Sequence, residues 1–91
     1  MIWAILVSDT AKRQLRKLKD SPRYELFARA ISELAESKDP AALGTFKRGS
    51  GLRCYAYNVT GSFRLLYTID RKNRTIILHA AGDHKQVYGK D

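Results

Sequence analysis

Hydrophobic and polar positions are ordered most clearly in the C-terminal third of the chain. The segments FRLLYTI (63–69) and TIILHAA (75–81) are rich in branched and aromatic residues, and the polar segment DRKNR separates them. This pattern predicts two β-strands joined by a tight turn. Because side chains alternate between the two faces of a strand, we expect Arg64 on the face opposite to Phe63 and Leu65. Antiparallel pairing also brings Arg64 close to the segment that follows the second strand.

Two helices are predicted upstream of this hairpin. The apolar run at residues 2–7 reads as a buried strand, and Ser8 and Asp9 after it are typical of a helix cap. The helix that follows has its apolar positions at helical spacing and basic residues on its other faces. A second helix starts at Ser21-Pro22, where proline is tolerated in the first turn. Its apolar stripe, which assigns Tyr24 and Phe27 to the core, comprises Tyr24, Phe27, Ala28, Ile31, Leu34 and Ala35.

The remaining segments complete an α+β fold. Residues 38–51 contain a proline and several glycines and are expected to form the longest irregular connection, with a helical turn near PAALG. LRCYAYNV (52–59) is a further strand that Thr60-Gly61-Ser62 turns into the hairpin. The predicted order is β-α-α-β-β-β. We expect a mostly antiparallel four-stranded sheet with the N-terminal helical hairpin packed on one face and the other face open to a partner.

Length and composition fit one small domain, residues 1–91, with a single core. No apolar run approaches the roughly 20 residues needed to span a bilayer, and the N-terminal apolar run does not resemble an export signal. The single cysteine, Cys54, cannot form an internal disulfide or a zinc site. A cytoplasmic location, no membrane association, and neither metal nor cofactor are therefore expected. The glycines at 44–51 also lack the spacing of a nucleotide-binding loop.

Charge is the most informative bulk property. The net charge is +8, and the excess lies in the second half: residues 1–40 hold eight basic and six acidic side chains, whereas residues 41–91 hold nine and three. A basic field concentrated on the sheet-forming half of a small domain attracts phosphate groups or an acidic protein segment. Charge alone does not separate nucleic-acid binding from the ordinary solvated surface of a basic protein.

Four features in this order resemble the RelE/ParE superfamily of small bacterial and archaeal toxins, especially the RelE-like mRNA interferases. They are the opening strand near Ile2-Trp3, the basic helix ending in KLK, the strand GSFRLLYTID and the terminal GDHKQVY. The resemblance covers nearly the whole chain. It implies a RelE-like fold and a toxin of a type II toxin–antitoxin system. It further implies a ribosome-dependent endoribonuclease that cuts mRNA and so inhibits translation. Its partners would be the ribosome, mRNA and a cognate antitoxin, expected to be acidic and partly helical and to form a hetero-oligomer with the toxin.

By this resemblance, Arg64, His84 and Tyr88 match the catalytic positions of the family. The chemistry fits, because RNA carries its own nucleophile and needs only a base, an acid and cations around the phosphorane. A permanently charged arginine fork pairs with two phosphate oxygens, and a histidine titrates near neutral pH. Tyr88 would stack on a base or orient the 2′-hydroxyl. Four further cations are candidates for binding the RNA backbone: Lys47, Arg48, Arg53 and Lys85.

Other interpretations of these residues stay open at this point. Arg64 would have a structural role if it paired with an acid such as Asp83, and His79, in mid-strand, is expected to be a partly buried structural residue. Several RelE enzymes carry two lysines where this chain has Ala56 and Asn58. A ParE-like inhibitor of DNA gyrase without nuclease activity is therefore an alternative, as is a catalytically inactive family member that binds only an antitoxin or RNA.

Overall fold

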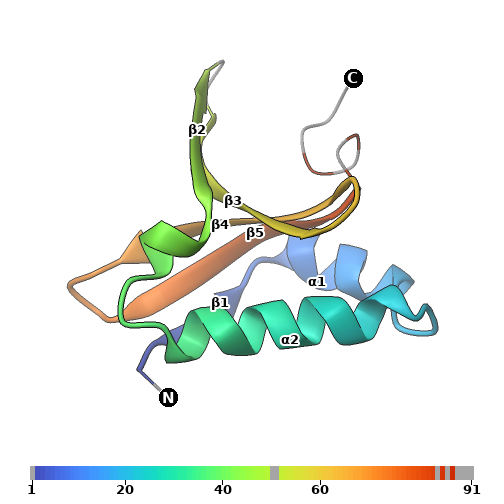
Figure 1. Ribbon diagram of the computed structural model, residues 1–91, viewed down its shortest axis with the longest axis horizontal. Coiled ribbons are helices and arrows are strands. Elements are labelled where there is room, and N and C mark those ends of the chain that lie inside the picture. The colour runs from blue at the N-terminus through green and yellow to red at the C-terminus, as the bar shows by residue number, and fades with distance from the viewer. Residues whose placement is uncertain (1, 50–51, 84, 86, 88–91) are drawn as a thin grey trace.

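The first strand of the chain lies beside the last one in the sheet (Figure 1). The computed structural model describes residues 2–49, 52–83, 85 and 87. In chain order, the elements of this part are β1 (Ala4–Val7), α1 (Asp9–Lys17), α2 (Arg23–Glu36), the 3₁₀ helix η1 (Pro40–Leu43), β2 (Thr45–Gly49), β3 (Leu52–Thr60), β4 (Phe63–Asp70) and β5 (Thr75–Asp83). The strand order is β1-β5-β4-β3-β2, with β1 parallel to β5 and the other pairs antiparallel. The predicted α+β class and mostly antiparallel sheet are confirmed.

The described residues form five strands, one more than the sequence predicts. The additional strand, β2, lies within residues 38–51, for which the sequence predicts an irregular connection, and pairs with β3. Its short sequence TFKRG has no alternating apolar pattern, so tertiary packing decides its conformation. The ring of Phe46 packs edge-on against that of Tyr55, with centroids 5.2 Å apart. The helical turn expected near PAALG is present as η1.

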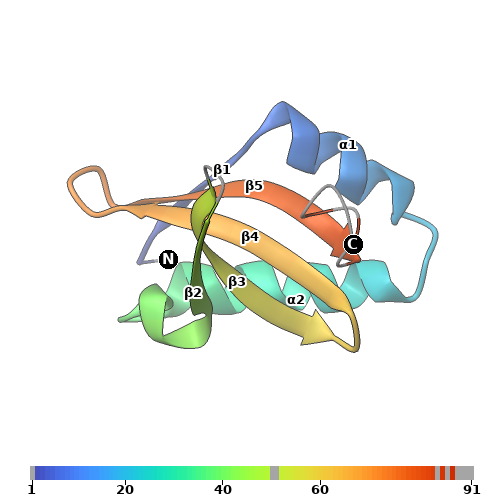
Figure 2. The ribbon, with the colours of Figure 1, turned by 90° about the horizontal axis from the view of Figure 1, so that it is seen from above.

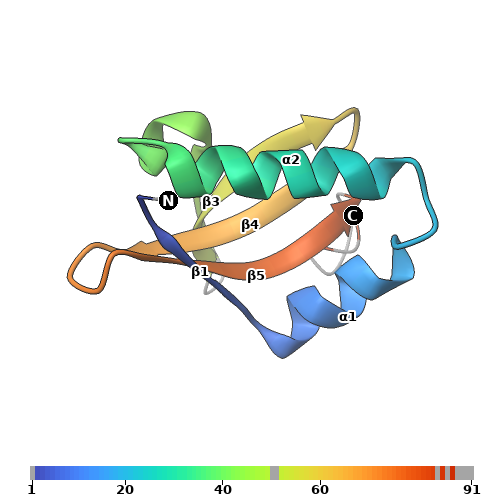
Figure 3. The ribbon, with the colours of Figure 1, turned by 90° about the horizontal axis from the view of Figure 1, so that it is seen from below.

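Both helices cover the same face of the sheet, as predicted (Figures 1 and 3). Ser8 caps α1, because its side chain accepts a hydrogen bond from the backbone N–H of Ala11 at 3.1 Å. Helix α1 lies against β5, where Oε1 of Gln14 accepts from the backbone N–H of Ala81 at 2.8 Å. Helix α2 crosses β3, β1 and β5, so each helix packs mainly on the sheet. No helix in the described part of the chain is long and apolar enough to cross a membrane.

The main core lies between the helices and the sheet. Its buried side chains are Trp3, Ala11, Phe27, Ala30, Leu34, Leu65, Tyr67, Ile76, Leu78 and Ala81. The stripe of α2 is buried at Phe27 and Leu34, as predicted, but Tyr24 is 40% exposed, so its assignment to the core is wrong. Tyr24 lies in the first turn of α2, where it lines an open surface pocket with Val7 and Leu15.

Strand β2 is anchored to this core through Tyr67. The Tyr67 side chain is fully buried, and its hydroxyl donates a hydrogen bond to the carbonyl of Pro40 at 2.6 Å. Glycine is required at position 44, because a Cβ there would lie 2.5 Å from the Tyr67 hydroxyl oxygen. The Tyr67 ring also stacks on Tyr55, with centroids 5.5 Å apart. These contacts fix where β2 leaves η1 and therefore where its basic side chains lie.

Candidate functional site

The face of the sheet that the helices leave uncovered is called the open face (Figure 2). Arg64, Leu66 and Thr68 of β4 lie on it, because the alternating residues Leu65 and Tyr67 are fully buried under the helices. Its floor is a second cluster of buried side chains, against which Val87 packs: Cys54, Ala56, Leu66 and Ala80. Strand β2 bends away from the helices and bounds this face on one side (Figure 1). The open face is thus an apolar floor with polar groups around it.

Two β-bulges determine which residues lie beside Arg64. On β3 the register shifts between Asn58 and Thr60, so Asn58 lies opposite Arg64. On β5 the register shifts next to Leu66 and Tyr67 of β4, so Gly82 lies opposite Arg64 on the other side. A bulge inserts one residue into one strand and re-aims the side chains that follow it. As a result, Arg64 lies between an amide side chain and a glycine.

The guanidinium of Arg64 is fixed through one of its three nitrogens. Nη1 donates hydrogen bonds to Oδ1 of Asn58 at 2.9 Å and to the carbonyl of Gly61 at 2.7 Å. It also donates to the carbonyl of Phe63, the preceding residue, at 3.2 Å. No carboxylate among the described residues pairs with Arg64, so the ion pair with Asp83 considered above is not formed. Nε and Nη2 bond to no described residue. The half-buried side chain therefore offers a fixed, charged fork to an incoming anion.

Gly82 leaves room beside this fork. It is buried, and its φ of 154° is one that residues with a side chain rarely adopt. Opposed residues in an antiparallel pair share a face, so a side chain at position 82 would project next to Arg64. The glycine thus adopts a backbone conformation that other residues avoid and places no side chain beside the guanidinium.

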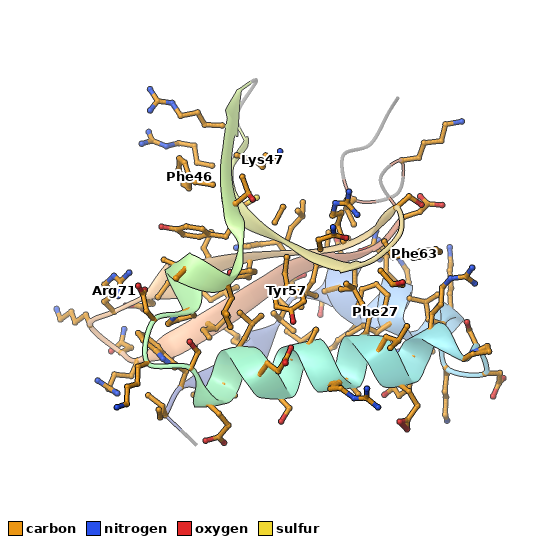
Figure 4. The ribbon with its side chains drawn as sticks, in the orientation of Figure 1. Phe27, Phe46, Lys47, Tyr57, Phe63 and Arg71 are labelled. Carbon is orange, nitrogen blue, oxygen red and sulfur yellow. The ribbon has the colours of Figure 1, made fainter. Side chains whose placement is uncertain are left out.

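The predicted backbone-binding cations are divided between two sides of the sheet. Lys47 pairs with Cys54, whose side chain belongs to the floor of the open face, and Figure 4 shows Lys47 and Phe46 on opposite sides of β2. Arg48 and Arg53 lie opposite each other in the β2–β3 pair, and both are exposed. They alternate with Lys47 and Cys54 and so project from the other side. Lys47 therefore shares the open face with Arg64, whereas Arg48 and Arg53 do not.

The remaining predicted site residues follow β5. Lys85 is exposed just beyond the end of this strand. His84 and Tyr88 lie outside the described residues, so their predicted roles stay predictions. Strand β5 ends at Asp83, one residue after Gly82, which lies opposite Arg64. The part of β5 that follows Ala81 therefore lies beside Arg64, as antiparallel pairing predicts, as far as the described residues reach.

Three residues of the open face have roles that the sequence pattern does not reveal. Asn58, noted above only for the lysine that it replaces, holds Arg64, and Gly82 makes space beside it. His79 is exposed on the open face, and its Nε2 lies 2.8 Å from Oγ1 of Thr68. His79 is more exposed than the sequence predicts, because the bulge on β5 turns its side chain outward. Partial burial against the sheet still lowers its pKa.

A family model described as the ParE-like toxin of type II bacterial toxin–antitoxin systems matches residues 5–90. No curated protein matches significantly. The metal-bound toxin from Helicobacter pylori has a TM-score of 0.76 at 19% identity, with 93% of this chain and 98% of that one covered. The toxin–antitoxin complex RelBE2 of Mycobacterium tuberculosis has a TM-score of 0.66 at 26% identity, with 91% of this chain and 99% of that one covered.

The archaeal RelE–RelB complex from Pyrococcus horikoshii is also similar, with a TM-score of 0.70 at 19% identity and coverage of 91% of this chain and 96% of that one. At such identities the structural likeness establishes the fold. The family model, which matches nearly the whole chain, establishes membership. The chain belongs to the ParE-like toxins of type II bacterial toxin–antitoxin systems, within the RelE/ParE superfamily.

Proposed function

We propose that this toxin is a ribosome-dependent endoribonuclease that cleaves mRNA on the open face of its sheet and so inhibits translation. One observation carries the proposal: Arg64 is held rigidly through Nη1 and pairs with no carboxylate among the described residues. An arginine with only a structural role commonly ends in an ion pair with an acid. An arginine whose Nε and Nη2 form no such ion pair suits an anion that offers two oxygens side by side, such as a phosphodiester.

The proposed reaction uses the 2′-hydroxyl of RNA as the nucleophile. A base removes its proton, the 2′-oxygen attacks the adjacent phosphorus, and the bond to the 5′-oxygen breaks as an acid protonates that oxygen. Arg64 stabilises the negative charge that develops on the phosphorane. We assign proton transfer to His84, because an imidazole has an ordinary pKa of about 6.5. Tyr88 is proposed to stack on a base or to orient the 2′-hydroxyl.

The rest of the RNA would lie along the open face. Lys47, on β2, and Lys85, after β5, are proposed to contact backbone phosphates on the two sides of Arg64. Arg48 and Arg53 project from the other side of the β2–β3 pair, so their proposed contribution to RNA binding is through the general positive field.

An antitoxin is the second proposed partner. The solved relatives from Mycobacterium tuberculosis and Pyrococcus horikoshii are toxin–antitoxin complexes. A net charge of +8 on 91 residues favours an acidic partner, and the open face is the part of the sheet that the helices do not cover. We propose that an acidic, partly helical antitoxin covers this face and displaces RNA from it. The attraction between the two proteins should weaken as salt is added.

A gyrase inhibitor is the alternative function, and one observation favours it. Where several RelE enzymes have lysines, Ala56 is buried in the floor and Asn58 is committed to Arg64. These two positions therefore supply no cation to the proposed phosphate site. The remaining possibility is a catalytically inactive toxin that binds an antitoxin or RNA.

A cleavage assay on translating ribosomes separates these functions. Wild type, Arg64→Lys, Arg64→Ala, His84→Ala and Arg29→Ala are each added to ribosomes programmed with one reporter mRNA, and the 5′ ends of the fragments are mapped. Arg29 is an exposed arginine on α2, so its removal is a matched control for lost charge. We expect cuts at codons in the decoding site for wild type and Arg29→Ala. Arg64→Lys should retain little cleavage, because an ammonium cannot form the two-pronged contact, and Arg64→Ala none.

Intact mRNA with the wild-type protein would refute the nuclease proposal. Inhibition of DNA supercoiling by gyrase under the same conditions would then support the alternative. If neither mRNA cleavage nor gyrase inhibition is found, the toxin is a family member that acts only by binding.

A further inference from the structure

His79 is presented on the open face by the bulge in β5. Leu78 pairs with Tyr67 and Ala80 pairs with Leu66, so His79 is the inserted residue and has no opposed residue on β4. Leu78 is buried in the main core and Ala80 in the floor of the open face. The side chain of His79 is exposed, and its contact with Thr68 places it on the same face as Arg64.

Hydrogen bonds fix both the backbone and one ring nitrogen of His79. Nε2 lies 2.8 Å from Oγ1 of Thr68. The hydroxyl of Ser8 donates to the carbonyl of His79 at 3.1 Å, and the backbone N–H of Ser8 donates to the carbonyl of Leu78 at 2.9 Å. Ser8 also caps α1, so the bulge is tied to a helix as well as to the sheet. A side chain with this support presents its free edge in a fixed direction.

The free edge is a neutral hydrogen-bonding group over apolar surface. Nδ1 of His79 bonds to no residue that the structure describes. Partial desolvation lowers the pKa of His79, so at neutral pH the ring is uncharged and carries one donor and one acceptor nitrogen. Next to it, Thr68 pairs with Ile77 and Ile77 pairs with Leu6, whose side chain is 57% exposed. This combination suits a nucleobase, which has flat apolar faces and polar edges, better than a phosphate.

We propose that His79, Thr68 and Leu6 form a base-binding subsite for a nucleotide that neighbours the scissile phosphate. This inference rests on the proposed RNA cleavage at Arg64. His79 lies three residues along β5 from Gly82, which faces Arg64, so at about 3.3 Å per residue the two sites are about 10 Å apart. That separation excludes His79 from the reacting phosphate. Its role is to bind an adjacent base and so to bias which sequences are cut.

The test compares wild type with His79→Ala, His79→Asn and Thr68→Val. Thr10→Val, at an exposed position in α1, is the matched control for loss of a threonine hydroxyl. The first readout is the distribution of cut sites along one mRNA on translating ribosomes. We expect His79→Ala to flatten the base preference at one position beside the cut and to slow cleavage at preferred sites by about 3- to 10-fold, the value of one net hydrogen bond. His79→Asn should retain part of the preference, and Thr10→Val all of it.

The second readout does not require cleavage. Binding of short 2′-O-methyl RNAs that differ in one base is measured by fluorescence anisotropy on proteins whose folding is checked by circular dichroism. Wild type should prefer one base, and His79→Ala should bind all four RNAs equally. If wild type cleaves mRNA but His79→Ala and Thr68→Val keep its cut-site distribution, the subsite is refuted and the nuclease function stands.

If wild type cleaves nothing, the nuclease proposal fails and the anisotropy data decide the subsite. A base preference that depends on His79 supports it, and identical binding by wild type and His79→Ala overturns it. Weakened antitoxin binding by His79→Ala, with base preference unchanged, would assign this surface to the protein partner and also overturn the inference.

Discussion

Replacing Asn58 with aspartate should stabilise the fold slightly and strongly impair RNA cleavage. Oδ1 of Asn58 accepts a hydrogen bond from Nη1 of Arg64 at 2.9 Å, so an isosteric carboxylate would turn this contact into an ion pair. Asn58 is exposed and Arg64 half-buried, so water screens the pair. We expect the free energy of unfolding to rise by about 0.2–1 kcal/mol, the range of solvent-exposed ion pairs. The same carboxylate would lie beside the proposed phosphate site and cancel the charge that Arg64 offers.

Cleavage should fall by about 100-fold, at the lower end of the effect of removing one preorganised donor from a charged transition state. Urea unfolding followed by the fluorescence of Trp3, which is buried in the core, measures stability, and mRNA cleavage on ribosomes measures activity. Asn58→Ala is the control, because it removes the acceptor without adding charge. It should lower stability by about 0.5–1.5 kcal/mol and reduce cleavage less than Asn58→Asp does. Wild-type cleavage by Asn58→Asp would refute the assignment of Arg64 to the phosphate.

Three further predictions concern the core and its titrating groups. Tyr67→Phe removes the buried hydrogen bond to Pro40 and should cost about 1–3 kcal/mol of unfolding free energy in urea, whereas Tyr57→Phe, at a half-exposed bond to Glu33, should cost less. The Glu33 hydrogen bond raises the pKa of Tyr57 to about 12. Because the unfolded tyrosine loses its proton near pH 10, the contribution of Tyr57 to stability should be constant below that pH and should be lost as pH rises toward 12. Over this range the stability of Tyr57→Phe should fall less steeply than that of wild type. Burial raises the pKa of the Cys54 thiol, so a thiol reagent should modify it slowly in the native protein and rapidly in urea. Equal rates in the two states would contradict its position in the floor.

The parts of the fold that periodicity controls could be predicted from the sequence. Alternation in FRLLYTI places Arg64 on the face opposite Leu65, and the structure confirms this because Leu65 is fully buried under the helices. The helical stripe is confirmed at Phe27 and Leu34. These predictions succeed because burying one face of a strand or helix supplies most of the energy that fixes its orientation.

The immediate surroundings of Arg64 could not be predicted, because they depend on the two bulges. A regular register from the turn at Gly61 would place Val59 opposite Arg64, whereas the bulge on β3 places Asn58 there. On β5 the inserted residue is His79, and neither this residue nor its neighbours in the sequence indicate a bulge. A bulge depends on packing between neighbouring strands, so local propensity does not reveal it. Strand β2 could not be predicted for a similar reason, because its partner β3 and the contact of Phe46 with Tyr55 come from another part of the chain.

The position of Arg64 relative to mRNA on the ribosome decides whether this toxin cleaves RNA with that residue. The measurement is a structure of the toxin on a ribosome whose mRNA carries 2′-O-methyl groups at the decoding site and so resists cleavage. We expect the Arg64 guanidinium to lie about 2.7–3.2 Å from a phosphate oxygen, with the mRNA crossing the open face beside β2. An mRNA bound against the helices, with Arg64 turned to solvent, would contradict this expectation.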